Sequence, residues 1–183
     1  MKKLFLLFLF ISPNFELLTP DSFSQGTWTQ IADFGGGVRG NAIGFSIGSK
    51  GYVGTGENSL NIYDDFWEYD TTANTWTQKA NFGGTARAGA VGFSIGTKGY
   101  VGTGIDVNGI LNDFWEYNPT TNVWIQKANF PGVVRFNAVG FSCSTKGYIG
   151  TGWDGNSNYL NDLWEFNPAI NSWAQKANMP GVP

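Results

Sequence analysis

The segment Lys98–Gly104, KGYVGTG, has the composition of a phosphate-binding loop, with three glycines in seven residues after an apolar run. Such loops present backbone N–H groups to phosphate, usually at the start of a helix. However, the glycine spacing is G-x-x-G-x-G, not G-x-G-x-x-G, and no helical pattern follows. The segment also recurs at Lys50 and Lys146, each 48 residues apart. This recurrence favours glycines that let a strand pass close to its neighbours and turn.

The residue inventory excludes several kinds of catalytic site. The 183 residues include no histidine, which removes Ser-His-Asp and Cys-His catalysis, most zinc sites and copper-imidazole sites. Cys143 is the single cysteine, so neither an intramolecular disulfide nor a two-cysteine metal motif can form. The net charge is −3, without a basic run beyond Lys2 and Lys3, which argues against nucleic acid as a partner. We therefore expect no cofactor and no metal.

A repeat of about 48 residues organises the chain, which is rich in glycine (26) and aromatic residues (16%). The second copy contains four short β-prone segments at 88–95, 100–104, 113–118 and 123–128, separated by turn sequences and without an amphipathic helical pattern. Four short strands in each period predict a propeller blade. Tryptophans that keep the repeat register are predicted to pack the blades: Trp28, Trp67, Trp76, Trp115, Trp124, Trp164 and Trp173.

The order of glycines, tyrosine and tryptophan in each copy resembles the kelch repeat. The matching residues are KGYVGTG…DFWEYDTTANTW, KGYVGTG…DFWEYNPTTNVW and KGYIGTG…DLWEFNPAINSW. The resemblance covers about residues 27–183 and implies an all-β fold, a kelch-type β-propeller of four-stranded antiparallel blades. The implied relatives are exported bacterial proteins similar to the central domain of galactose oxidase, whose copper centre needs histidines that this chain lacks.

The repeat predicts three complete blades, at about 39–80, 87–128 and 135–177, within a propeller region spanning 25–183. A leading strand at 27–32 precedes them. Since kelch propellers close as rings of six or seven blades, three blades leave open faces. We expect this chain to be part of a larger ring. The alternative is self-association through the open blade faces into a six-bladed ring.

The N-terminus predicts export to the cell surface or secretion. Lys2 and Lys3 precede eight apolar residues, Leu4–Ile11, which is too short for a membrane span but suits the core of a signal peptide. Small residues at positions −3 and −1, Ser22 and Ser24, place the cut before Gln25, so residues 1–24 form the expected signal peptide.

The face opposite the short turns is the expected binding face. In an antiparallel blade with strands a to d, the b–c loops and the d–a linkers share this face, and the b–c loops at 57–64, 105–112 and 153–161 differ between copies. Trp153 is the leading candidate because its counterparts are Glu57 and Ile105, so the repeat does not require an indole there. Asp154, Asp106 and Glu57 accompany it as candidate ligand-binding residues.

Three arginines recur in the d–a linkers, at Arg39, Arg87 and Arg135. At the mouth of the propeller channel they could bind a carboxylate or phosphate through two nitrogens. The alternative is a structural pairing with the repeating glutamates Glu68, Glu116 and Glu165, and their regular repetition favours that alternative.

Two further features have structural explanations. Asp154, Asn156, Asn158, Asp162 and Glu165 fit positions of a calcium loop, but Tyr159 stands where that loop needs glycine, so we expect no calcium site. Cys143 replaces an isoleucine of the other copies and is expected to be a buried small hydrophobe rather than a reactive thiol.

These observations predict a non-catalytic binding module that recognises a protein or a glycan through the b–c and d–a face. A kelch-type sugar-modifying enzyme, such as a carbohydrate isomerase using carboxylate and arginine groups, is one alternative. A structural spacer within a larger surface protein is the other.

Overall fold

The structure is a computed structural model that describes residues 27–180. The chain divides into two compact units, residues 1–30 and 31–183. The expected signal peptide at 1–24 lies outside the described residues. The second unit contains all the assigned strands, and the description below concerns this unit alone.

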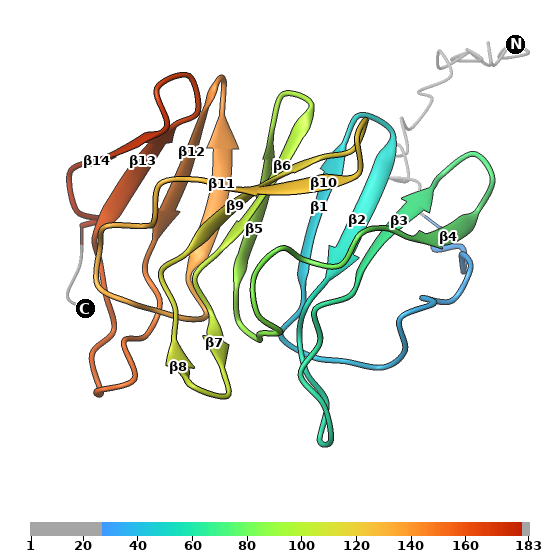
Figure 1. The fold of residues 1–183 in the computed structure, drawn as a ribbon, viewed down its shortest axis with the longest axis horizontal. Helices are drawn as coiled ribbons and strands as arrows, with labels where there is room; N and C mark the ends of the chain where they lie inside the picture. The colour runs from blue at the N-terminus through green and yellow to red at the C-terminus, as the bar shows by residue number, and fades with distance from the viewer. Residues whose placement is uncertain (1–26, 181–183) are drawn as a thin grey trace, which may run out of the picture. The chain divides into compact units, whose positions relative to one another are not determined.

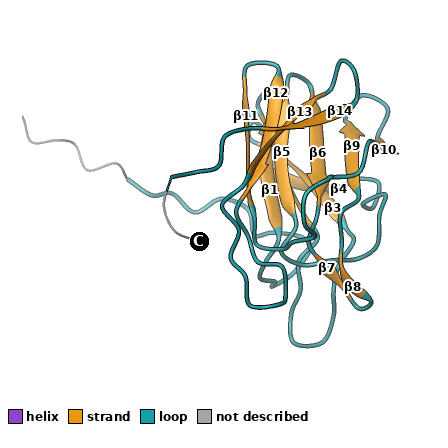
Figure 2. Cartoon of the chain, turned by 90° about the vertical axis from the view of Figure 1, so that its left-hand side faces the viewer, coloured by secondary structure: helices purple, strands orange, loops and turns teal. Residues whose placement is uncertain are grey.

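The second unit contains three four-stranded antiparallel sheets, each from one repeat (Figures 1 and 2). The first sheet comprises β1 (Ile43–Ile47), β2 (Lys50–Gly54), β3 (Phe66–Asp70) and β4 (Thr75–Gln78). The second comprises β5 (Val91–Ile95), β6 (Lys98–Gly102), β9 (Phe114–Asn118) and β10 (Val123–Gln126). The third comprises β11 (Val139–Cys143), β12 (Lys146–Gly150), β13 (Leu163–Asn167) and β14 (Ser172–Gln175). Each sheet is an up-and-down blade, as the sequence predicts.

The tight turns that join strands a and b lie at the opposite end of the sheets from the b–c loops (Figure 1). Turn residues with positive φ make these reversals, and they include Gly48 and Gly96 between strands a and b and Asn74 and Asn122 between strands c and d. Short turns whose geometry recurs from blade to blade therefore occupy one face, and the longer loops that vary between blades occupy the other.

The glycines of the repeated GTG segment work as the sequence predicts. A side chain at Gly102 would meet the ring of Phe114 at 2.6 Å and the carbonyl oxygen of Asp113 at 2.7 Å, so strand b passes too close to strand c for a Cβ. Gly104 has φ +92°, and a Cβ at this position would lie 2.8 Å from the Ala88 carbonyl oxygen. The segment therefore serves a close strand approach followed by a sharp exit from the blade.

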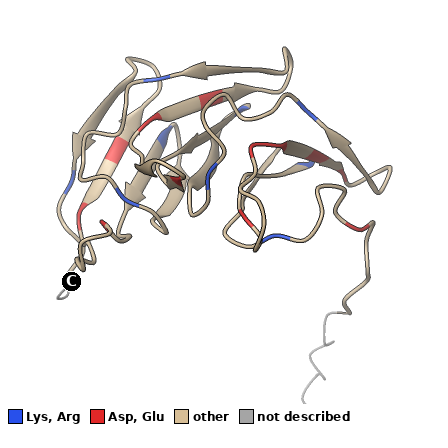
Figure 3. Ribbon diagram, turned by 60° about the horizontal axis from the view of Figure 1, so that its bottom comes forward, with Lys and Arg blue, Asp and Glu red and all other residues tan. Residues whose placement is uncertain are grey.

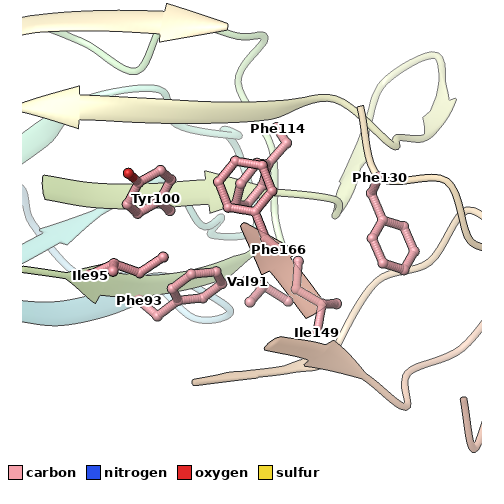
Figure 4. Close-up of a cluster of buried hydrophobic side chains, with 8 residues drawn as sticks. All are labelled: Val91, Phe93, Ile95, Tyr100, Phe114, Phe130, Ile149 and Phe166. Carbon is pink, nitrogen blue, oxygen red and sulfur yellow. The ribbon is translucent and has the colours of Figure 1, made fainter. Parts of the chain in front are cut away.

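Aromatic rings fill the space between consecutive blades. Between the second and third blades, Phe114 contacts Phe166 and Trp173 edge-on, with ring centroids 4.9 Å apart in both pairs. Phe66 makes the equivalent contacts with Tyr117 and Trp124 between the first and second blades. Figure 4 shows the layer between the second and third blades, in which Val91 and Phe93 of β5 lie near Ile149 and Phe166 of the third blade.

Glycines on one blade receive side chains from the preceding blade. A Cβ at Gly99 would lie 2.5 Å from the ring of Phe45, and a Cβ at Gly147 would lie 2.7 Å from Cζ of Phe93. Gly92 likewise faces Ile43 and Phe45 of the preceding blade. The apolar side chains of strand a thus rest on bare backbone in strands a and b of the next blade.

A second contact repeats between blades at the outer strands. The indole N–H of Trp124 donates to the carbonyl oxygen of Ala80, 3.2 Å away, and the Ala80 N–H donates to the Asn122 side chain over 3.0 Å. Trp173 and Asn171 hold Ala128 in the same way. Of the seven tryptophans predicted to pack the blades, six are half-buried and Trp28 is exposed.

Two features differ from the sequence-based expectations. The described residues 27–32 form no strand and Trp28 is fully exposed, because they have no neighbouring strand c among the described residues with which to pair. The second b–c loop, expected to be irregular, forms a small hairpin of β7 (Ile105–Asp106) and β8 (Gly109–Ile110). Its turn contains the pair Asn108-Gly109, a strong hairpin signal that the repeat-based reading did not use.

The packing of Phe93 on Gly147 predicts a strong effect of a side chain there. We expect Gly147→Val to lower the free energy of unfolding by about 1–3 kcal/mol, because the added carbons overlap a ring that is 4% exposed. The measurement is urea denaturation followed by tryptophan fluorescence. Gly40→Ala is the control, since nothing lies within 4 Å of a Cβ at Gly40. Equal unfolding midpoints in the two variants would contradict this account of the interface.

Candidate binding face

Three b–c loops project from the face opposite the tight turns, one from each blade (Figure 1). Each loop carries one large side chain that is strongly exposed: Leu60 at 86%, Val107 at 85% and Tyr159 at 71%. Sequence reasoning did not single out these three residues. Their signal is that they occupy the middle of the loops that differ between copies.

One residue at the same position stabilises each b–c loop. The Asn58 side-chain oxygen accepts hydrogen bonds from the N–H groups of Leu60 and Asn61, both over 2.9 Å. Asp106 accepts from the N–H groups of Asn108 and Gly109 over 2.7 and 3.0 Å. Asp154 accepts from the N–H groups of Asn156 and Asn158 and from the Asn158 side-chain amide. The predicted ligand-binding residues Asp106 and Asp154 therefore hold loop backbone, which accounts for their recurrence.

These hydrogen bonds also set the acidity of the two aspartates. Burial alone would raise the pKa of Asp106, but hydrogen bonds from Asn108, Thr85 and Gly109 outweigh burial and lower it. Hydrogen bonds from Asn158 and Asn156 lower the pKa of Asp154. Both aspartates are thus anions whose charge is turned towards their own loop.

A shallow groove of about 510 Å³ lies between the first two b–c loops. Residues of both loops and of the linker between the first two blades line this groove: Asn58, Ser59, Leu60, Asn61, Ile62, Thr85, Ala86, Asp106, Val107 and Asn108. Asp106 is the one predicted site residue among them. Neighbouring blades therefore combine their loops into a single concave surface.

Trp153 and Glu57 open the third and first b–c loops. The Trp153 ring packs edge-on against Phe136, with centroids 5.1 Å apart, and its backbone bridges to Phe136 and Tyr159. Glu57 makes the same bridge to Gly40 and accepts a hydrogen bond from the Asn41 side chain over 2.9 Å. Trp153 is half-buried as a support for its loop, whereas Tyr159 presents the more exposed aromatic ring.

The three repeating arginines are buried. Arg87 and Arg135 are 0% exposed, and the Arg39 side chain is 3% exposed. Arg87 donates to both carboxylate oxygens of Asp113 over 2.5 and 2.8 Å and to the carbonyl oxygen of Thr103 over 3.0 Å. Its guanidinium carbon lies 4.7 Å from the centre of the Phe82 ring.

Arg39 and Arg135 make the same two-nitrogen pairing, with Asp65 and Asp162 respectively. Each of these aspartates also accepts a 2.8 Å hydrogen bond from the indole N–H two residues further along the chain. In all three guanidinium groups both terminal nitrogens thus donate to protein acceptors, and Nε of Arg39 has no hydrogen-bond partner among the described residues.

The expected pairing of these arginines with glutamates is wrong. Glu68, Glu116 and Glu165 instead accept hydrogen bonds from the tyrosine hydroxyls of Tyr52, Tyr100 and Tyr148 and lie near lysines at 3.8, 3.4 and 3.3 Å. The reason is register, because these glutamates lie opposite the strand b tyrosines. The aspartate at the start of strand c comes next to the linker instead, and it receives the arginine.

Cys143 is exposed in the structure, contrary to the expectation that it is buried. Its counterpart Ile95 is 8% exposed because the next blade covers it, and no described blade covers β11. Among residues 27–180, no group of three or more metal-ligating side chains is positioned to hold an ion. Positive and negative residues are interspersed along the strands rather than gathered on one surface (Figure 3).

Comparisons with known proteins agree with this architecture. A family model described as the Kelch motif matches residues 152–180. The chain carries a kelch motif. The solved structure of YjhT is similar over 78% of this chain and 52% of its own chain, with a TM-score of 0.67 and 22% sequence identity. This chain therefore spans about half the length of that protein's chain, and the likeness supports the propeller-blade fold. No curated protein matches the sequence at a significant level.

The Arg87–Asp113 pair predicts a large stability effect. We expect Arg87→Met to lower the free energy of unfolding by about 3–5 kcal/mol, because it leaves a carboxylate without its buried partner. Arg87→Lys should destabilise less, since it retains the charge but loses the second hydrogen bond. Chemical denaturation measures both. Lys50→Met is the control, because it breaks an ion pair with Asp70 that is about one third exposed and therefore contributes little. A midpoint for Arg87→Met as high as that of the control would contradict the structural role.

The aspartates that receive the arginines also predict a pH dependence. Burial would raise the pKa of Asp65 and Asp162, but hydrogen bonds from Arg39 and Trp67, and from Arg135 and Trp164, lower it below the usual value. A carboxyl with a depressed pKa in the folded state stabilises the fold above its unfolded pKa of about 3.9 and loses that contribution as the pH falls further. We therefore expect the thermal unfolding temperature to decrease as the pH is lowered below about 4. Asp162→Asn should be less stable at neutral pH and should show a weaker dependence on acid pH. An unchanged slope would contradict the assignment.

Proposed function

We propose that this chain is a non-catalytic binding module that recognises a protein ligand through the exposed tips of its b–c loops. The observation that carries the proposal is the set of three exposed apolar side chains, Leu60, Val107 and Tyr159, on one face of a rigid scaffold. At protein interaction sites a few side chains supply most of the affinity, and tyrosine is prominent among them, so Tyr159 is the first candidate anchor of this face.

The polar groups of the same face support binding rather than catalysis. Asn58, Asp106 and Asp154 are committed to loop backbone, and the arginines are committed to aspartates. A general acid or base needs a titratable group that reaches the substrate. A glycan remains the second candidate ligand, because Tyr159 offers an exposed ring for stacking on a sugar.

The proposed setting is the cell surface or the extracellular medium, on the basis of the N-terminal sequence. Within residues 27–180, no helix is long and apolar enough to cross a membrane. A fusion of residues 1–24 to a reporter enzyme that works only after export tests this setting.

Loop-tip variants test the binding face. An array of extracellular proteins and a glycan array are probed with the wild-type chain and with Leu60→Ser, Val107→Ser and Tyr159→Ala. We expect at least one of these changes to weaken a wild-type hit by roughly tenfold or more, as at an interface hot spot. Hits on the protein array support the proposal, and hits on the glycan array alone identify the second candidate.

Ile170→Ala is the matched control, because Ile170 is 69% exposed but lies in a c–d turn on the opposite face. Loss of binding in this control together with the loop variants would indicate a general fault and not a site. Binding that survives all three loop changes would overturn the proposed face. Trp153→Ala adds a test of the third loop, since its ring supports that loop from Phe136.

A further inference from the structure

The two outer blades expose complementary halves of the contact that joins the blades internally. At each internal contact, strand a of one blade contributes apolar side chains, here called the knob. Strands a and b of the next blade contribute two glycines, here called the socket. Ile43 and Phe45 rest on Gly92 and Gly99, and Val91 and Phe93 rest on Gly140 and Gly147.

The third blade carries a knob without a socket. Val139 and Phe141 on β11 are 57% and 45% exposed, whereas their counterparts Val91 and Phe93 are 2% and 4% exposed. The Phe141 ring already has the arrangement of its buried counterparts. It stacks on Tyr148 with centroids 5.1 Å apart, as Phe93 stacks on Tyr100 at 5.9 Å. The knob is therefore preformed for a partner.

The first blade carries a socket without a knob. The nearest described atom to a Cβ at Gly51 is Cβ of Tyr69 in the same blade at 3.6 Å, and the nearest to a Cβ at Gly44 is the Tyr52 carbonyl oxygen at 3.8 Å. At the corresponding glycines of the other two blades, side chains of the preceding blade occupy the space that a Cβ would take. Gly44 and Gly51 therefore keep bare backbone at a place where no described side chain needs it.

We propose that the knob of one copy of this chain inserts into the socket of a second copy. Residues 27–180 carry both halves, so a two-fold arrangement of two copies forms two identical contacts. Two copies of the three described blades give six, within the range of four to eight in which propellers close, whereas three copies would give nine. The chain would then assemble as a dimer with Phe141 of each protomer against Gly51 of the other.

The test is the mass of the purified full chain in solution, measured by light scattering and native mass spectrometry over a range of concentrations. We expect a species of twice the chain mass of 20.0 kDa. Gly51→Val should raise the dimer dissociation constant by roughly tenfold or more, because it fills the socket. It should leave the fold of the chain intact, because its own blade has room for the side chain. Phe141→Asp should do the same from the knob side.

Two controls separate this contact from non-specific association. Gly40→Ala places a methyl group in open space away from the socket, and Val123→Asp places a charge on a 47% exposed position of β10. Both should remain dimeric. In an equimolar mixture of Gly51→Val and Phe141→Asp, a mixed pair keeps one intact contact, between the knob of the first variant and the socket of the second, whereas neither variant alone can form an intact contact. Association should therefore be stronger in the mixture than in either variant alone.

The outcomes decide the proposal. A wild-type chain that stays monomeric at every concentration would overturn it. The knob of the third blade and the socket of the first blade would then be contact surfaces for blades outside the described residues. Association that Gly51→Val does not weaken would also overturn it, since exposed Phe141 would then be acting as a non-specific apolar patch. Circular dichroism of each variant establishes that the blades are folded, so that a loss of association can be assigned to the contact.

Discussion

The seating of an apolar side chain on a neighbouring glycine backbone is the constraint on which this architecture depends. Phe45 occupies the space that a Cβ would take at Gly99, and Phe93 does so at Gly147. Each of these contacts couples residues slightly more than one repeat apart, so the knob and the socket must keep the same spacing in every copy. The glycines of the second and third KGY sequences, Gly99 and Gly147, are therefore fixed by the side chains of the blade before them.

Buried polar pairs allow the variable loops to coexist with this close packing. Arg87 closes the blade between the linker, the end of strand b and the start of strand c, through Thr103 and Asp113. With the exit of strand b and the entry of strand c fixed, the b–c loop between them is free to change sequence. One side chain, Asn58, Asp106 or Asp154, then stabilises each loop from within. The strands and their buried ion pairs thus form the constant part of each blade, and the b–c loop is the part that differs between blades.

The sequence predicts the blades well because the pattern that encodes them occurs three times. Repetition reveals the strands, the turns and the tryptophans, and it favours a structural role for the arginines. It does not identify their acceptors, since Asp113 and Glu116 recur with equal regularity and only the pairing of strands b and c decides between them. Nor does it show that Asp106 turns into its own loop or that Tyr159 is more exposed than Trp153. Those outcomes depend on side-chain directions within loops that the repeat does not specify.

The two proposals meet at the b–c loops. Adjacent blades bring the Leu60 and Val107 loops to either side of one groove. In a closed pair of chains, the third blade of one copy would lie beside the first blade of the other, in the same relation. The Tyr159 loop would then stand next to the Leu60 loop of the second copy, and association would complete a further groove. A ligand that bridges those two loops would bind the dimer more tightly than the single chain, and by linkage it would stabilise the dimer by the same free energy.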